Sequence, residues 1–243
     1  GIFSSRFYRD NQQWYRYFKS DQQLDDVRAM SYFFNEVRQE RIDIFLEAAR
    51  KGADGVLVGC CRQVPMLLYN PQMVAAYQKE TGIDPRTIDG SNLDQYTKWI
   101  TWRADYFTQF LRDLKKGLDP IRNQSNRRIP VAVRIPSAGF LYNLAQGLDV
   151  RQWLREGLVD QLHLDPLDDL SGRGSHDVRP YIEMGQKYGV PIIGGIGGTW
   201  AWSPDGYVTT LSRALGLLES GVDGIEIYET EVHAKCNEHR WLL

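Results

Sequence analysis

The stretch Lys51-Gly-Ala-Asp-Gly-Val-Leu-Val-Gly59 has a counterpart near the other end of the sequence, Ser220-Gly-Val-Asp-Gly-Ile-Glu-Ile-Tyr-Glu229. In each, a Gly-x-Asp-Gly turn follows an amphipathic helical pattern and precedes a short apolar run. This order is typical of a helix that leads into a buried parallel strand, so the chain repeats a βα unit. The copies end differently, because carboxylates follow the late strand and Gly59-Cys60-Cys61-Arg62 closes the early one. Function has to be sought at such strand ends.

Composition bounds the class of protein. The chain has 243 residues, of which 42% are hydrophobic and 25% are charged, enough to bury one large core. The net charge is −2, and the longest basic run is a short loop at 126–128, so we expect no nucleic-acid partner. The longest apolar runs have the length of strands, so we expect no membrane span. The three cysteines do not form a disulfide framework, because two of them are adjacent.

Apolar periodicity predicts strands that alternate with helices. The predicted strands cover 55–58, 129–135, 158–165, 191–195 and 222–228, and the predicted helices 35–52, 71–81, 94–117, 149–156, 177–188 and 205–219. In the first helix Asn35 is the expected N-cap and Gly52 the C-cap, while Phe140 and Tyr142 fall in a loop. Such alternation predicts an all-parallel sheet, either doubly wound or closed into a barrel.

The barrel is the favoured form. The glycine-rich segment Gly194–Gly198 lacks the spacing of a dinucleotide-binding turn, which would have favoured the doubly wound sheet. A (β/α)8 TIM-type barrel needs three more strands, and residues 1–34 are too short and irregular to supply them. We therefore expect residues 1–243 to form a single α/β barrel domain that lacks its first three βα units, either as part of a longer protein or as an unusually built barrel.

The order of several segments resembles the glycosyl-hydrolase-like (family 10-like) TIM-barrel proteins, a family formerly of unknown function. The segments are Ser5–Arg9, Tyr32–Arg38, Ala53–Arg62, Trp99–Arg103, Trp153–Asp160 and Val222–Tyr228. The resemblance implies a TIM barrel that acts on a poly- or oligosaccharide, and a bacterial protein that is secreted or periplasmic.

The resemblance also implies a difference at the first predicted strand. The family pattern is Asp-Gly-x-x-x-Asp-x-x-Arg, and this sequence keeps Asp54, Gly55 and Arg62 but has Gly59 in place of the second acid. A glycosidase needs two carboxyl groups, one protonated to assist the leaving oxygen and one ionised as nucleophile or base. One of the usual pair is therefore missing, and its substitute has to come from another strand end.

Carboxylates close two other strands. Alternation along 161–165 places Gln161, His163 and Asp165 on one face, so Asp165 is the first candidate for the catalytic acid. Glu229 and Glu226 are its candidate partners. The alternative is structural, because a residue before proline can organise a turn and polar residues inside a barrel can form a satisfied hydrogen-bonded layer.

Further side chains are candidates for substrate contacts. Arg62 and Arg134 lie at the ends of apolar strands, where they would bind a ligand or form an internal salt bridge with Asp165 or a glutamate. His163 is either a substrate contact or a hydrogen-bonded core histidine. Sugar rings pack on aromatic rings, so aromatic residues in the loops are also candidates. The alternative is that these residues only pack the loops against the protein. The aromatic candidates are Tyr69, Tyr142, Trp200, Trp202 and Tyr228.

Other chemistries are less well supported. No His-x-x-x-His or Cys-x-x-Cys spacing occurs, so we predict no metal and no cofactor. Cys60 or Cys61 could act as a nucleophile or simply fill buried space. Three functions stay open: a carbohydrate hydrolase, a catalytically impaired glycan-binding barrel, and a phosphate-binding barrel that uses Gly194–Gly198. The carboxylates of the last strand would repel an anion, which argues against the phosphate-binding barrel. Oligomeric state stays open.

Overall fold

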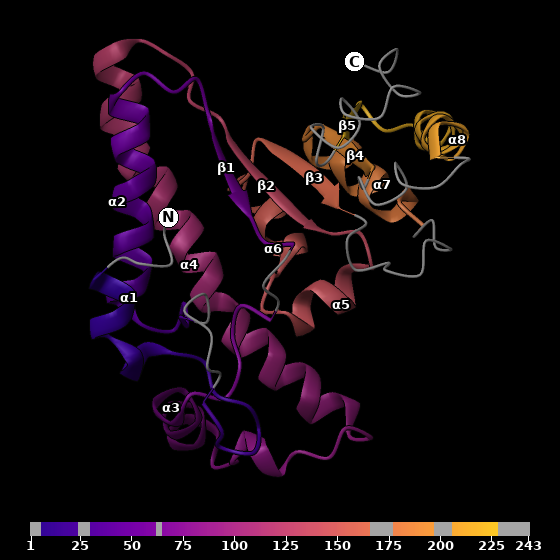
Figure 1. The fold of residues 1–243 in the computed structure, drawn as a ribbon. Helices are drawn as coiled ribbons and strands as arrows, with labels where there is room; N and C mark the ends of the chain where they lie inside the picture. Colours follow the sequence, from indigo (N-terminus) through magenta and orange to yellow (C-terminus); the bar gives the residue numbers. More distant parts are fainter. Residues whose placement is uncertain (1–5, 24–29, 62–64, 166–176, 197–205, 228–243) are drawn as a thin grey trace. The chain divides into compact units, whose positions relative to one another are not determined.

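The computed structural model describes residues 6–23, 30–61, 65–165, 177–196 and 206–227 (Figure 1). The chain divides into two compact units, which we describe separately. Unit 1 comprises Gly1–Val56, Gln63–Ile129 and Phe140–Gln152, and unit 2 comprises Leu57–Arg62, Pro130–Gly139 and Trp153–Leu243.

A single sheet of five parallel strands dominates unit 2. The strands are β1 (Val56–Gly59), β2 (Val131–Pro136), β3 (Gln161–Asp165), β4 (Ile192–Ile196) and β5 (Gly224–Ile227), and they lie in the order β1-β2-β3-β4-β5. This order follows the sequence without the reversal that a doubly wound sheet contains. The predicted α/β class with a TIM-barrel-type sheet is confirmed, with five strands that correspond to part of such a barrel.

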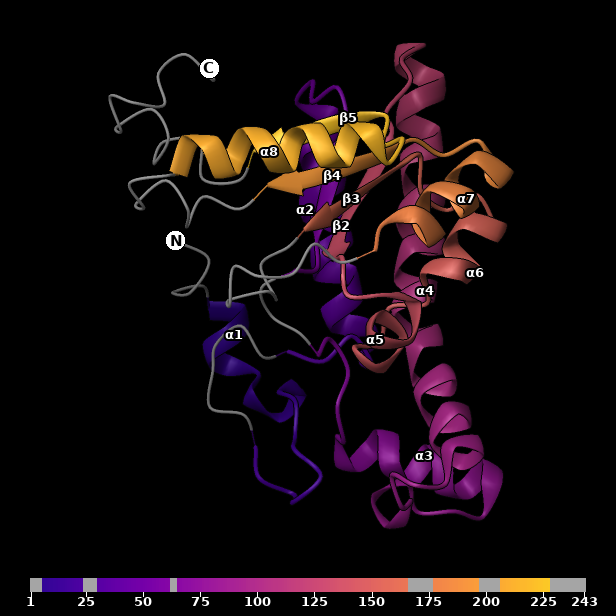
Figure 2. The same cartoon turned by 90° about the vertical axis from the view of Figure 1, so that its right-hand side faces the viewer.

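One face of this sheet is apolar and packs on helices. Val133, Leu162 and Ile192 on it are 1% exposed or less. Helices α7 (Arg179–Tyr188) and α8 (Gly206–Glu219) contact β4, and α8 runs along β4 in Figure 2. Packing is close, since a Cβ built at Gly194 would lie 3.0 Å from a methyl group of Leu217. The opposite face of the sheet carries the polar side chains.

Helices form most of unit 1. The longest, α4 (Leu93–Ser125), packs against α2 (Asn35–Arg50). Around them lie α1 (Arg6–Asp10), α3 (Pro71–Thr81), α5 (Phe140–Ala145) and the short 3-10 helices η2 (Gln12–Trp14) and η3 (Pro85–Thr87). Helix α6 (Val150–Arg155) begins in unit 1 and ends in unit 2. No helix among the described residues is both long and apolar enough to cross a bilayer.

Several predicted boundaries were wrong. Helix α4 continues past Gly117 and through Pro120 to Ser125, and its C-cap Asn126 has a left-handed φ of 49°. The reason is burial, because Leu114 and Leu118 continue the apolar stripe at 0% exposure. Residues 140–145, expected as a loop, form α5.

The ends of α2 and α3 show how well caps can be predicted. Helix α2 takes Phe34 rather than Asn35 as its N-cap, and Gly52 lies one residue beyond the C-cap with a φ of 105°. Helix α3 has the predicted bounds, with Asn70 before its first residue and Gly82 in the left-handed conformation after its last.

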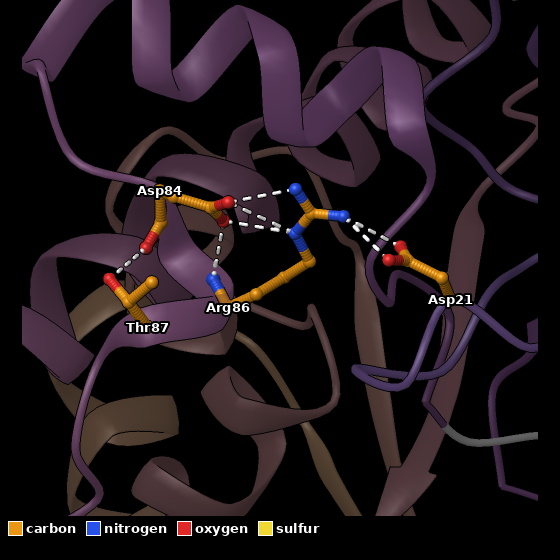
Figure 3. Close-up of polar contacts among 4 residues, drawn as sticks. All are labelled: Asp21, Asp84, Arg86 and Thr87. Atoms are coloured by element: carbon orange, nitrogen blue, oxygen red, sulfur yellow. Dashed lines mark hydrogen bonds and ion pairs between the residues drawn. The ribbon is translucent and has the colours of Figure 1, made fainter.

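An ion-pair cluster in unit 1 joins two turns (Figure 3). Arg86 of η3 donates from Nη1 to both carboxylate oxygens of Asp21, at 2.7 and 2.8 Å, and from Nε and Nη2 to Asp84. Asp21 has a left-handed φ of 61°, in a turn where the Phe18 amide donates to Gln22 O. The Arg86 guanidinium thus ties the 18–22 turn to η3.

Candidate functional site

The candidate site lies on the polar face of the sheet in unit 2. Arg134 of β2 forms an ion pair with Glu226 of β5, through Nη2 to Oε1 and through Nε to Oε2 at 3.3 Å. The same Nε lies 3.8 Å from Oδ2 of Asp165, at the end of β3. One guanidinium therefore faces two carboxylates from different strands. The internal salt bridge that was the structural alternative for Arg134 is present, with Glu226 as partner.

His163 of β3 completes this cluster. Its Nδ1 lies 2.5 Å from Oε2 of Glu226, and its Nε2 lies 3.2 Å from Oε1 of Gln161. Burial, and then the nearby Arg134 charge, lower the pKa of His163 below its ordinary value. The ring therefore carries one proton at neutral pH.

Strand alternation and register explain this convergence. Gln161, His163 and Asp165 alternate with two buried leucines, as predicted, and Arg134 lies opposite His163 in the β2–β3 register. On β4 the residue opposite Glu226 is Gly195. Because Gly195 has no side chain, Glu226 reaches past β4 to His163 and Arg134.

Asp165 is the most buried carboxylate of the site, at 3% exposure. Its backbone oxygen accepts from the Ser137 amide at 3.0 Å, which fixes the end of β3 against the end of β2. Burial, and then this carboxylate, raise the pKa of Cys61 to about 12. Burial likewise raises the pKa of Cys60. Neither thiol is a nucleophile at neutral pH, because the thiolate is the reactive form.

The separation of the two carboxylates is limited by the guanidinium between them. Glu226 Oε2 lies 3.3 Å and Asp165 Oδ2 lies 3.8 Å from the same Arg134 Nε, so these two oxygens are at most 7.1 Å apart, the sum of the two distances. Carboxyl groups in glycosidases stand about 5–5.5 Å apart in retaining enzymes and about 6.5–9.5 Å apart in inverting ones. The pair in this site is compatible with the separation that glycosidase chemistry needs.

The structure thus brings together four of the predicted site residues: Arg134, His163, Asp165 and Glu226. Tyr69 and Tyr142 belong to unit 1, where the Tyr69 ring lies 5.5 Å from that of Trp99 and Tyr142 is 36% exposed. The remaining candidates lie outside the described residues: Arg62, Trp200, Trp202, Tyr228, Glu229 and the end of the glycine-rich segment, Gly197 and Gly198.

Two further residues touch the site, Gln161 and Cys61. Sequence reasoning gave Gln161 no role, and it considered Cys61 only as a nucleophile or as a residue that fills buried space. The signal for Gln161 was its place two residues before His163 on the same strand face. The signal for Cys61 was weaker, because only the β1–β2 pairing, in which the Cys60 amide donates to Arg134 O, brings it beside the site. Among the described residues, no three His, Cys, Asp or Glu side chains gather in a way that could hold a metal ion.

Comparison with known proteins supports the fold. No family model matches the chain, and no curated protein matches it. Among solved structures, the glycoside hydrolase domain of PgaB (BpsB) from Bordetella bronchiseptica is similar over 88% of this chain, with a TM-score of 0.62 and 17% identity. The chain spans 63% of the length of that domain. The comparison therefore shows a fold similar to that of this domain, while the more specific family that the sequence resembles is not confirmed.

Proposed function

We propose that this chain is a glycoside hydrolase that cleaves a poly- or oligosaccharide at the polar face of the sheet. The observation that carries the proposal is the pair of carboxylates, Asp165 and Glu226, that two strand ends place on one guanidinium. The glycoside-hydrolase-like fold supports it. Asp165 is the proposed acid, and Glu226 the proposed partner, with Glu229 as an alternative partner.

The two carboxylates have different surroundings, which suits different roles. Asp165 is 3% exposed and its Oδ2 lies 3.8 Å from Arg134 Nε, whereas both oxygens of Glu226 accept from Arg134. In this proposal Asp165 protonates the leaving oxygen and Glu226 acts in its ionised form as base or nucleophile. In this proposal the sugar contacts in unit 2 are assigned to Arg62, Trp200, Trp202 and Tyr228.

The test is cleavage of a panel of soluble oligosaccharides, read by mass spectrometry of the products. We expect the wild-type chain to release shorter oligosaccharides, and Asp165→Asn and Glu226→Gln to lower the rate by about 100-fold or more. Glu183→Gln is the matched control, because Glu183 is exposed on helix α7, and it should cleave at the wild-type rate. Full activity of Asp165→Asn would refute the proposed acid.

A second candidate is a glycan-binding barrel with impaired catalysis. The observation that favours it is the engagement of Glu226 by both Arg134 and His163, together with Gly59 where the family resemblance leads us to expect an acid. No described atom lies within 4 Å of a Cβ built at Gly59, so the described residues leave room for a Cβ there. This candidate predicts that oligosaccharides bind the wild-type chain uncleaved and that Gly59→Asp gains cleavage.

A further inference from the structure

We propose that His163 is a positioning residue: its Nδ1–H donates to Oε2 of Glu226 and holds that side chain as an ionised carboxylate, which leaves the acid role to Asp165. The catalytic meaning of this inference rests on the proposed function. The position of the proton between His163 and Glu226 is independent of the proposed function and can be measured without a substrate.

The contact between Nδ1 and Oε2 requires a proton. The two atoms lie 2.5 Å apart, and an unprotonated ring nitrogen and a carboxylate oxygen are both acceptors. Two acceptors at this distance repel each other, so one of them carries hydrogen. The proton belongs either to the His163 ring or to a neutral carboxyl group of Glu226.

Arg134 decides between the two sites. It donates from Nη2 to Oε1 and from Nε to Oε2 of Glu226, so both oxygens face a permanent positive charge. A guanidinium that engages both oxygens stabilises the ionised carboxylate more than the neutral acid. The proton therefore lies on Nδ1, and Glu226 is an acceptor from two donors on two different strands.

Gln161 holds the other side of the ring. Its side-chain amide lies 3.2 Å from Nε2 of His163. Burial and Arg134 lower the pKa of His163, so the neutral ring has its single proton on Nδ1 and an acceptor at Nε2. A half-turn of the Gln161 amide then presents NH2 to Nε2, since its oxygen and nitrogen exchange places. If the ring gains a second proton, Nε2 donates to the amide oxygen and Nδ1 keeps its proton.

This arrangement gives each group one orientation. The Gln161 amide orients the ring, the ring and Arg134 orient the carboxylate, and Gly195 leaves the space through which Glu226 reaches them. A carboxylate that accepts from two fixed donors is held in place for attack or proton abstraction. It is a poor proton donor, which is why Asp165 is the acid.

The direct test is the protonation of the ring nitrogens in the full chain labelled with 15N-histidine. Long-range proton–nitrogen spectra at pH 7 distinguish a proton on Nδ1 from one on Nε2, and loss of the signal in His163→Gln assigns it among the four histidines. We expect Nδ1 to be protonated. A neutral ring with its proton on Nε2 alone would overturn the inference, because the carboxyl group would then hold the other proton.

Two variants separate positioning from a merely structural role. The amide of Asn in His163→Asn places a donor near the position of Nδ1, whereas Gln in His163→Gln places it near that of Nε2. We expect His163→Asn to keep kcat close to that of the wild type, and His163→Gln to lower kcat by up to about 100-fold with little change in KM.

Equal losses in the two variants would contradict the positioning role. If the wild-type chain cleaves no oligosaccharide, the proposed function fails, and the ring spectra still decide the inference about His163.

Discussion

At the scale of single residues, the site depends on how charges are paired on a partly buried surface. Arg134 is 17% exposed and Asp165 is 3% exposed, so an unpaired charge would be costly for either. In the site, the Arg134 guanidinium lies beside two carboxylates, and His163 donates to one of them. Each of these charges therefore has a partner of opposite charge or a hydrogen-bond donor. Such an arrangement serves stability and also fixes the atoms that chemistry would use.

The thiol of Cys61 should respond to its neighbour Asp165. Burial and then the Asp165 carboxylate raise the pKa of Cys61 to about 12, so we expect very slow alkylation by iodoacetamide at pH 8 in the native chain. Asp165→Asn removes the negative charge, lowers this pKa and should speed alkylation. Fragment ions in tandem mass spectrometry distinguish alkylation of Cys61 from that of the adjacent Cys60. An unchanged rate would show that the carboxylate does not act on the thiol.

His163 should make stability depend on pH with a definite sign. Its pKa is lowered in the folded state relative to about 6.5 in the unfolded chain, so the unfolded state binds the proton more readily. The stabilisation is complete above about pH 6.5 and is lost as pH falls through the folded pKa. Urea unfolding at pH 7.5 and pH 5 should therefore show a larger fall in the free energy of unfolding for the wild type than for His163→Gln. An equal fall in both would refute the shift.

Sequence reasoning placed Gln161, His163 and Asp165 on one face because side-chain alternation is local. It could not choose the partner of Arg134, which lies 92 residues from Glu226. That choice depends on the register of β2, β3, β4 and β5 together, and on a glycine at position 195 whose importance is visible only when β5 pairs with β4.

At the scale of elements, glycines set how closely helices approach the sheet. A Cβ built at Gly185 of α7 would lie 2.6 Å from both Val190 O and Cγ1 of Ile192, and the first of these is backbone that cannot move aside easily. In α8, no described atom lies within 4 Å of a Cβ built at Gly216. The two positions are a matched pair in neighbouring helices.

Alanine at these two glycines should have opposite effects on stability. Gly185→Ala should lower the free energy of unfolding by about 1–3 kcal/mol, because the methyl group overpacks the contact with β4. Gly216→Ala should raise it by about 0.5–1 kcal/mol, since alanine favours the helix where nothing obstructs it. Urea unfolding with equal m values measures both. A stabilising Gly185→Ala would contradict the packing described for α7.

The ion-pair cluster of Figure 3 should control the 18–22 turn. Arg86→Ala removes both Asp21 and Asp84 as partners of one guanidinium, so the amides of Phe18 and Asp21, which donate within this turn, should exchange hydrogen faster. Lys98→Ala, which breaks an exposed pair with Asp94 on α4, is the control and should leave the turn unchanged. Unaltered hydrogen exchange in Arg86→Ala would show that the 18–22 turn is stable without the Arg86 ion pairs.

Local signals predicted α3 to the residue, since Asn-Pro and Thr-Gly mark its ends. They stopped α4 too early at Gly117, whose Cβ position lies 3.0 Å from Leu46 of α2. There the glycine permits a close approach between two helices and does not end one. Helix α5 was missed because it is only six residues long and lacks a clear apolar period.

At the scale of the whole molecule, the order of the strands carries the functional argument. Five parallel strands in sequence order place every strand end on one edge, which is where parallel α/β folds bind ligands. Repetition of the Gly-x-Asp-Gly unit predicted this sheet, because it is a property of the local sequence. The division into two compact units was not predicted, because in the sequence a long helix such as α4 has the same pattern as the helix of an ordinary βα connection.

The central claim is that the polar face with Arg134, His163, Asp165 and Glu226 is a carbohydrate site. It is tested most directly by titrating oligosaccharides into the 15N-labelled chain and following backbone amide and histidine ring signals. The account predicts saturable shifts at 161–165, 224–227 and the His163 ring, and none on the exposed face of α7. Shifts confined to other surfaces, or no shifts with any oligosaccharide, would contradict it.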